Sequence, residues 1–137
     1  MDNTERGKLS MPIDPTVLAE ARALVAEAGM AGFVPAGAAP ASTDGQPVAI
    51  ALIDPVVRSP GTPNFDKPDP DRPGVVRSAS ILAALRDGTP LPPLLLFQRA
   101  GEQRYELREG FHRFHLCAAL GYTHVPADVT DWKPGEY

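Results

Sequence analysis

The sequence predicts a small mixed α/β domain that contains a short sheet and three main helices. Segments with apolar residues at helical spacing alternate along the chain with short apolar or alternating runs that are typical of strands. Hydrophobic residues make up 43% of the 137 residues, which is enough for one buried core. No internal repeat is apparent, so we expect a compact α/β arrangement rather than a solenoid.

The first helix is expected over residues 14–28. Asp14 is a good N-cap, Pro15 suits the first helical position, and Gly29 and Gly32 provide the stop. The helix is amphipathic, so its apolar face must dock either on the rest of this chain or on a partner protein. The apolar positions are Val17, Leu18, Ala21, Leu24, Val25 and Ala28.

A linker and a proline-rich segment flank the first expected strand. Residues 36–47 are rich in Ala, Gly, Pro and Ser, which divides the chain into an N-terminal part, 1–47, and a domain, 48–137. Residues 48–53 form an apolar run that predicts a buried strand. Residues 55–73 contain six prolines, which excludes a helix or a central strand there. Such a long loop is either a functional lid or disordered, and both alternatives stay open.

The next segment predicts a helix followed by a β-hairpin. Ser78 or Ser80 can cap the helix, and Gly88 can close it. Residues 92–97 and 103–108 then form two strands joined by a short loop that contains glycine.

A buried helix and a last strand complete the domain. The helix covers residues 111–120, is almost entirely apolar after its first turn, and ends at Gly121. The strand covers residues 124–129, and Pro126 within it predicts an edge strand or a bulge.

Composition excludes several classes of protein. The formal net charge of −4 argues against a broad basic surface for nucleic acid. No apolar run is long enough to cross a membrane, and the N-terminus leads into no signal-peptide core. The single cysteine, Cys117, cannot form an intrachain disulfide and is expected to be a small buried side chain. We therefore expect a cytoplasmic protein without a membrane partner.

The passage from Tyr105 to Tyr122 is the strongest candidate for a site. An expected strand runs into Gly110, and His112 and Arg113 then open the buried helix. The first turn of a helix presents N–H groups and the positive end of the dipole, so an anion is the natural ligand. Glycine allows close approach of a phosphate, and Arg113 can bond two of its oxygens.

On these residues the chain resembles the ParB/sulfiredoxin superfamily. The likeness covers roughly residues 48–131 and is close over 103–129. Its most specific part is the Gly-x-His-Arg tetrad between a strand and a buried helix. The matching positions are Gly110, His112, Arg113, Ala118, Leu120, Gly121, Val125 and Pro126.

The resemblance implies a fold and a ligand. In that family this turn cradles nucleotide phosphates, which implies that a nucleotide, with Mg²⁺, or another phosphorylated small molecule contacts Glu109, Gly110, Phe111, His112 and Arg113. His112 and Arg113 are then the catalytic candidates for slow phosphate hydrolysis or transfer. His112 would act as acid or base and Arg113 would stabilise phosphate charge. No residue is assigned to a protein-held metal.

The chain departs from the family pattern at one position of the turn. Phe111 occupies the slot that holds a nucleophilic cysteine in sulfiredoxin-like members and often glutamate in partition proteins. Cys117 lies two turns further along and does not replace that cysteine. The sequence also shows neither the second nucleotide motif nor the helix-turn-helix of partition proteins, which argues against centromere binding. A DNA-binding or nuclease-like role ranks third, after ligand binding and a protein-interaction role, because the chain is acidic and lacks these DNA-reading elements.

Structural interpretations of the same residues remain open. His112 and Arg113 could pair with Glu106, Glu109 or Asp128 in a polar cluster that only supports the fold. Phe111 and Phe114 are expected to belong to the core rather than to stack on a base.

Two further alternatives concern a metal and a partner protein. His112, His115 and His124 could share a metal ion, although no carboxylate or thiolate obviously joins them. The chain could instead be a non-catalytic interaction module that binds a protein partner through the 14–28 helix or the proline-rich loop.

Overall fold

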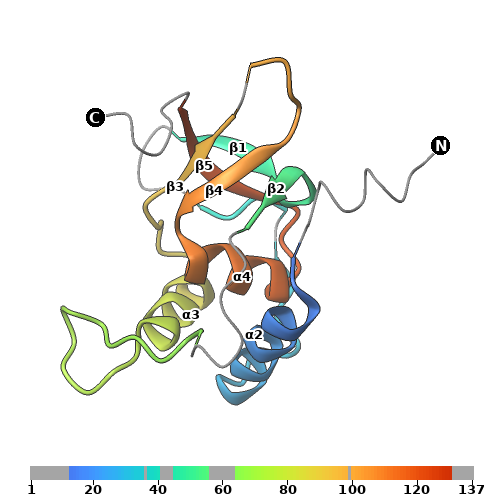
Figure 1. Ribbon diagram of the computed structural model, residues 1–137. Coiled ribbons are helices and arrows are strands. Elements are labelled where there is room, and N and C mark those ends of the chain that lie inside the picture. Colours follow the sequence, from blue (N-terminus) through green and yellow to red (C-terminus); the bar gives the residue numbers. More distant parts are fainter. Residues whose placement is uncertain (1–12, 36, 41–44, 56–63, 99, 131–137) are drawn as a thin grey trace.

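The computed structural model describes residues 13–35, 37–40, 45–55, 64–98 and 100–130 (Figure 1). Within these residues the chain forms three α-helices and a five-stranded mixed sheet, which confirms the predicted α/β fold class. In Figure 1 the helices lie together on one side of the sheet, with α4 (Phe111–Leu120) next to the strands. α4 therefore forms the layer between the sheet and the other two helices.

The strand order is β1-β5-β3-β4-β2. β5 pairs parallel with β3 and antiparallel with β1, while β4 pairs antiparallel with β3 and parallel with β2. The expected β3–β4 hairpin is thus confirmed. The strands are β1 (Gln46–Ala49), β2 (Ile53–Asp54), β3 (Leu94–Phe97), β4 (Tyr105–Glu109) and β5 (His124–Thr130).

The apolar run at 48–53 is divided between the two edges of the sheet, so its prediction as one strand is wrong. The 3₁₀ turn η1 (Ile50–Leu52) separates β1 from β2. The four Cα–Cα steps from Ala49 to Ile53 span at most roughly 14 Å. A flat five-stranded sheet would place its edges about 19 Å apart. The sheet must therefore curl so that its edges approach each other.

Pro126 lies in an interior strand, which corrects the prediction of an edge or a bulge. β5 has β1 on one side and β3 on the other, and Pro126 stands opposite Pro47 of β1. Ile50 N–H donates to the Thr123 carbonyl at 2.9 Å, which sets the alternation of bonded pairs along these strands. Pro47 and Pro126 fall at a non-hydrogen-bonded pair, where no N–H is exchanged. On the other side of β5, the pairing with β3 begins only at Ala127, one residue after Pro126.

The amphipathic helix α2 (Pro15–Glu27) packs on this same chain. Its N-cap is confirmed, because the Asp14 carboxylate accepts from the Thr16 N–H at 2.8 Å. α2 lies against α4, and its buried residues are Val17, Ala21 and Val25. The apolar face of the helix is therefore already covered by its own domain.

α4 supplies the centre of the core. Phe114 and Leu116 are fully buried, and they join buried residues of α2, α3 (Arg77–Asp87) and the sheet in one apolar cluster. Left-handed glycines follow both α3 and α4, at Gly88 and Gly121, as the sequence predicts.

The start of α3 differs from the prediction that a serine caps it. The N-cap residue is Val76, which makes no side-chain cap hydrogen bond. Ser78 is buried in the first turn, and the Ser80 hydroxyl donates to Asp69 Oδ2 at 2.6 Å. The serine signal therefore reflects a contact with the preceding loop rather than with the helix backbone.

Candidate functional site

The turn between β4 and α4 brings the predicted site residues together. Glu109 ends β4, Gly110 is the N-cap of α4 with φ +108°, and Phe111, His112 and Arg113 form its first turn. Helical hydrogen bonding begins with the Phe114 N–H, which donates to the Gly110 carbonyl at 2.8 Å. The turn is therefore the electropositive N-terminal end of a buried helix.

Gly110 is required by packing as well as by its backbone conformation. A φ of +108° strains any residue that carries a Cβ. A Cβ at this position would also overlap Cδ2 of Leu94 in β3 and come within 3.4 Å of Arg113 Nη2. The glycine thus permits the turn to lie directly on β3.

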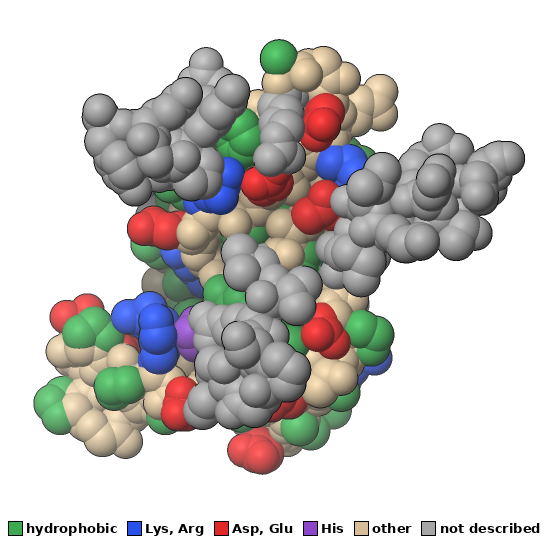
Figure 2. Space-filling model, in the orientation of Figure 1, with side chains coloured by type: hydrophobic (Ala, Val, Ile, Leu, Met, Phe, Trp, Pro, Cys, Tyr) green, Lys and Arg blue, Asp and Glu red, His purple; other side chains and the backbone are tan. Residues whose placement is uncertain are grey.

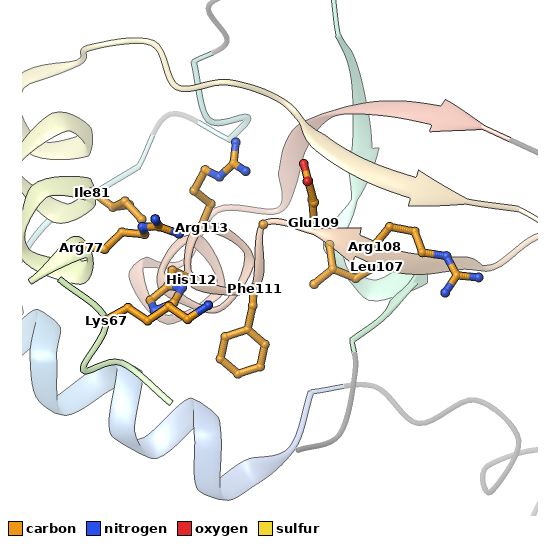
Figure 3. A pocket seen from close by; sticks show the side chains of 10 residues that line it. Lys67, Arg77, Ile81, Leu107, Arg108, Glu109, Phe111, His112 and Arg113 are labelled. Carbon is orange, nitrogen blue, oxygen red and sulfur yellow. The ribbon is translucent and has the colours of Figure 1, made fainter. Parts of the chain in front are cut away.

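A pocket of about 460 Å³ opens beside this turn (Figure 3). All five predicted ligand-binding residues line it, and it also contains residues from β4, α3 and the preceding loop. Figure 2 shows Lys and Arg side chains gathered beside a histidine on this face of the molecule. The lining residues are Lys67, Arg77, Ile81, Leu107, Arg108, Glu109, Gly110, Phe111, His112 and Arg113.

Arg113 is engaged by the main chain that precedes β3. Its Nη1 donates to the carbonyl of Pro92 and, at 3.3 Å, to that of Pro93. Burial lowers the pKa of its guanidinium; Glu109 opposes this shift, and the nearby positive charge of Arg77 adds to it. In Figure 3 the side chain extends away from Lys67 and Arg77.

Arg108 is also engaged elsewhere. Its Nη2 pairs with Glu106 Oε1 at 3.1 Å, and its guanidinium lies 5.1 Å from the centre of the Phe97 ring. Figure 3 shows it pointing to the opposite side of the pocket from Lys67. Both arginines therefore border the pocket while their charged ends bind protein groups.

Sequence reasoning missed Arg108 and two further cations of the lining, Lys67 and Arg77. Lys67 lies in the proline-rich loop, and Arg77 directly precedes Ser78 and Ser80, the two residues predicted to cap the helix. Figure 3 shows both side chains beside His112. No local pattern in the sequence predicts that these two residues are neighbours, because they come together only when the chain folds back over the ten positions between them.

His112 and His115 are both buried in α4, at 5% and 1% exposure. His115 Nδ1 lies 2.8 Å from the Phe111 carbonyl, and because that oxygen can only accept, Nδ1 carries a hydrogen. His112 borders the pocket and lies edge-on to Phe65, with 5.5 Å between the ring centres. His112 is thus the histidine that a ligand in the pocket could reach.

Phe111 lies at the margin of the pocket and packs against protein rings. Its centre is 4.3 Å from that of His115 and 5.9 Å from that of Phe65. Phe114, in contrast, is fully buried. The prediction that both rings belong to the core is therefore confirmed for Phe114 and wrong for Phe111, which is half-buried and lines the pocket.

Arg113 is not paired with the carboxylates of the polar cluster that the structural interpretation predicts. Within the described part of the chain, no ion pair joins Arg113 to Glu106, Glu109 or Asp128. The structure shows backbone carbonyls in their place. Arg113 therefore supports the fold, but through different partners from those expected.

The three histidines do not form a metal site. His124 is exposed on β5, with Nδ1 2.9 Å from the Thr123 hydroxyl. Among the described residues no group of three or more His, Cys, Asp or Glu side chains could hold an ion.

Cys117 is buried in the middle of α4, as predicted, and does not line the pocket. Burial raises the pKa of its thiol to about 12. The thiol is therefore protonated at neutral pH and is a poor nucleophile.

The described part of the proline-rich loop contacts the helices at Asn64, Phe65 and Asp69, and it is closed on itself by a hydrogen bond between Asp69 and Val75. Asp69 N–H donates to the Val75 carbonyl at 2.8 Å, and Asn64 Nδ2 donates to Glu20 of α2 at 2.6 Å. Phe65 lies over the start of α4. Residues 56–63, the other part of the predicted lid or disordered segment, lie outside the described residues.

Comparison of the chain with protein-family models, with curated proteins and with solved structures found no match. None of the helices in the described ranges is long and apolar enough to cross a membrane.

Proposed function

We propose that the pocket beside the β4–α4 turn binds a nucleotide or another phosphorylated small molecule. The observation that carries this proposal is the charge of the lining. Four of its ten residues are Lys or Arg and only Glu109 is acidic, and two of the four, Lys67 and Arg77, carry charged ends that bind no other described residue, whereas the whole chain has a net charge of −4. A concentration of cations in one concave site of an acidic protein favours an anionic ligand.

The size and the apolar part of the pocket suit a ligand larger than a phosphate ion. A volume of about 460 Å³ falls within the range of small-molecule sites. Ile81, Leu107 and Phe111 add apolar surface to the lining. The phosphate would lie at the cationic end, and the remainder of the ligand would contact these three side chains.

A divalent cation fits this site only as a companion of the ligand. Mg²⁺ prefers oxygen ligands, and Glu109 is the one carboxylate in the lining. Phosphate oxygens would have to supply most of its coordination. Mg²⁺ would then neutralise part of the phosphate charge.

We extend the proposal to slow phosphate hydrolysis or transfer through His112, since its ring borders the pocket. His112 would donate or accept the proton, and the cations would stabilise charge on the phosphate. The membership of the ParB/sulfiredoxin superfamily belongs to the same proposal. Release of inorganic phosphate from a bound nucleotide, lost in His112→Gln, is the measurement for this step.

Titration of the protein with ATP, ADP, CTP and GTP, each with and without Mg²⁺, tests binding. We expect at least one nucleotide to raise the melting temperature in a concentration-dependent way. Arg77→Gln should weaken this response, because a charge-assisted hydrogen bond contributes roughly 1.5–3 kcal/mol. The matched control is Arg86→Gln on the same helix, since Arg86 is exposed and pairs with Asp87 at 3.1 Å away from the pocket.

Two outcomes would contradict the proposal. The first is the absence of any thermal shift with all four nucleotides when the wild-type protein is folded. The second is an equal loss of response in Arg77→Gln and Arg86→Gln, which would indicate non-specific attraction to positive charge.

A further inference from the structure

We infer that Lys67 and Arg77 form a two-cation phosphate clamp and that Arg113 is a positioning residue rather than a ligand contact. This inference rests on the proposed function and deepens it. It assigns the phosphate contacts to a loop and to α3, outside the Gly-x-His-Arg turn. It also changes which substitutions should weaken binding.

The clamp lies at the neck of loop 68–76, which is the point where the two ends of the loop meet. The Arg77 N–H donates to the Lys67 carbonyl at 2.8 Å, so the residues on either side of the loop are bonded to each other. Pro68 and Val76 form an antiparallel bridge one step further in. These contacts hold the two cationic residues side by side although they lie ten positions apart in the sequence.

Both cationic side chains face the pocket. Lys67 and Arg77 line it, and in Figure 3 they extend toward His112 from the same wall. Across the described chain, neither side chain has a hydrogen bond or an ion pair to another residue. Arg77 also acts electrostatically on the Asp69 carboxylate, but that carboxylate accepts its hydrogen bonds from Ser80 and Asp71, so an anion in the pocket would find the donors of both cationic side chains available.

The neck is fixed to α3 by Asp69. Its Oδ2 accepts from the Ser80 hydroxyl at 2.6 Å, and its Oδ1 accepts from the Asp71 N–H at 2.9 Å. Ser80 lies on the first turn of α3, the helix that begins with Arg77. The carboxylate therefore sets the position of Lys67 relative to Arg77 without contacting the pocket itself.

Arg113 has a different function. Its guanidinium donates to the carbonyls of Pro92 and Pro93, which lead into β3. To bind a phosphate with the same atoms it would have to release these carbonyls. Arg113 thus keeps the β4–α4 turn against β3 and shapes the pocket indirectly.

Isothermal titration with inorganic pyrophosphate at low salt tests this assignment in the full chain. Lys67→Gln and Arg77→Gln should each weaken binding by about tenfold or more and should reduce its dependence on salt. Arg113→Gln should lower the melting temperature while affinity at a temperature where it is folded stays within about threefold of wild type. Arg86→Gln should change neither quantity.

The possible failures are distinguishable. If the wild-type protein binds neither pyrophosphate nor any nucleotide, the proposed function itself is wrong. If the wild type binds and Lys67→Gln and Arg77→Gln bind equally well, the clamp alone is wrong. Arg113→Lys serves where Arg113→Gln does not fold: a large affinity loss with an unchanged melting temperature in this variant would make Arg113 a ligand contact and overturn its assignment.

Discussion

Gly110 at the start of α4 lies directly against the side chain of Leu94 in β3. Gly110→Ala should therefore destabilise the fold for two reasons. The backbone is left-handed at φ +108°, which costs about 1–2 kcal/mol for alanine, and the added methyl overpacks the contact, which costs about 1–3 kcal/mol. Urea denaturation monitored by circular dichroism measures the change in the free energy of unfolding.

Gly29→Ala is the matched control for this substitution. Gly29 has φ +75°, but a Cβ there meets nothing within 4 Å. It should show only the backbone cost. Equal destabilisation by the two substitutions would mean that the contact with Leu94 contributes nothing.

The hydrogen bond from Ser80 to Asp69 predicts that acid destabilises the fold at the neck of loop 68–76. This bond is the main reason that the pKa of Asp69 lies below its ordinary value of 3.8. A carboxyl whose pKa is lower in the folded state stabilises the fold above pH 3.8, and this contribution disappears as the pH falls through the folded pKa. Asp69→Asn should thus be less stable than wild type at pH 6, and the difference should vanish well below pH 3.8.

Ser80→Ala is the companion to Asp69→Asn. It removes the same hydrogen bond from the other side, so the double variant should be little worse than either single one. Full additivity of the two effects in thermal melts would contradict the bond.

Cys117 predicts slow thiol chemistry. Its thiol has a pKa of about 12 in the fold, so it should react with a disulfide reagent at pH 8 only as fast as the protein opens. Unfolded in urea it should react at once. The raised pKa also means that folding stability falls as the pH rises from 9.0 toward 12, where only the unfolded thiol ionises. Rapid labelling of the folded protein would show that the helix is open.

The packing of α2 on α4 predicts that Ala21 tolerates no larger side chain. Ala21 is fully buried, so Ala21→Leu should cost about 1–3 kcal/mol through overpacking. Ala19 is exposed on the same helix, and Ala19→Leu should change stability by less than about 0.5 kcal/mol. Similar denaturation midpoints for the two variants would contradict the packing of α2 on its own domain.

The start of α2 and the ends of α3 and α4 could be predicted because their signals are local, whereas the start of α3 could not. Asp14 bonds the backbone two residues away, and Gly88 and Gly121 adopt the left-handed conformation that ends a helix. Each of these signals needs only a few neighbouring residues. The same holds for the β4–α4 turn, whose strand, glycine and apolar helix are consecutive.

The errors came from features that depend on distant partners. The periodicity of 48–53 shows that the run is buried, but it does not show that Val48 pairs with β5 and Ile53 with β4. A proline excludes an interior position in a sheet only where the N–H that it lacks would have to donate to a neighbouring strand. Lys67 and Arg77 share a pocket because a bridge closes the loop between them, and no local rule identifies that bridge.

The opposition of Pro47 and Pro126 also has a consequence for contacts between molecules. β1 is an edge of the described sheet. At a non-hydrogen-bonded pair, the N–H and C=O positions of the β1 residue point away from β5, toward the open edge. Pro47 therefore leaves the outer side of a four-residue strand without a donor near its middle. A strand from a second chain could form no continuous ladder there, so this edge resists sheet extension and the aggregation that follows from it.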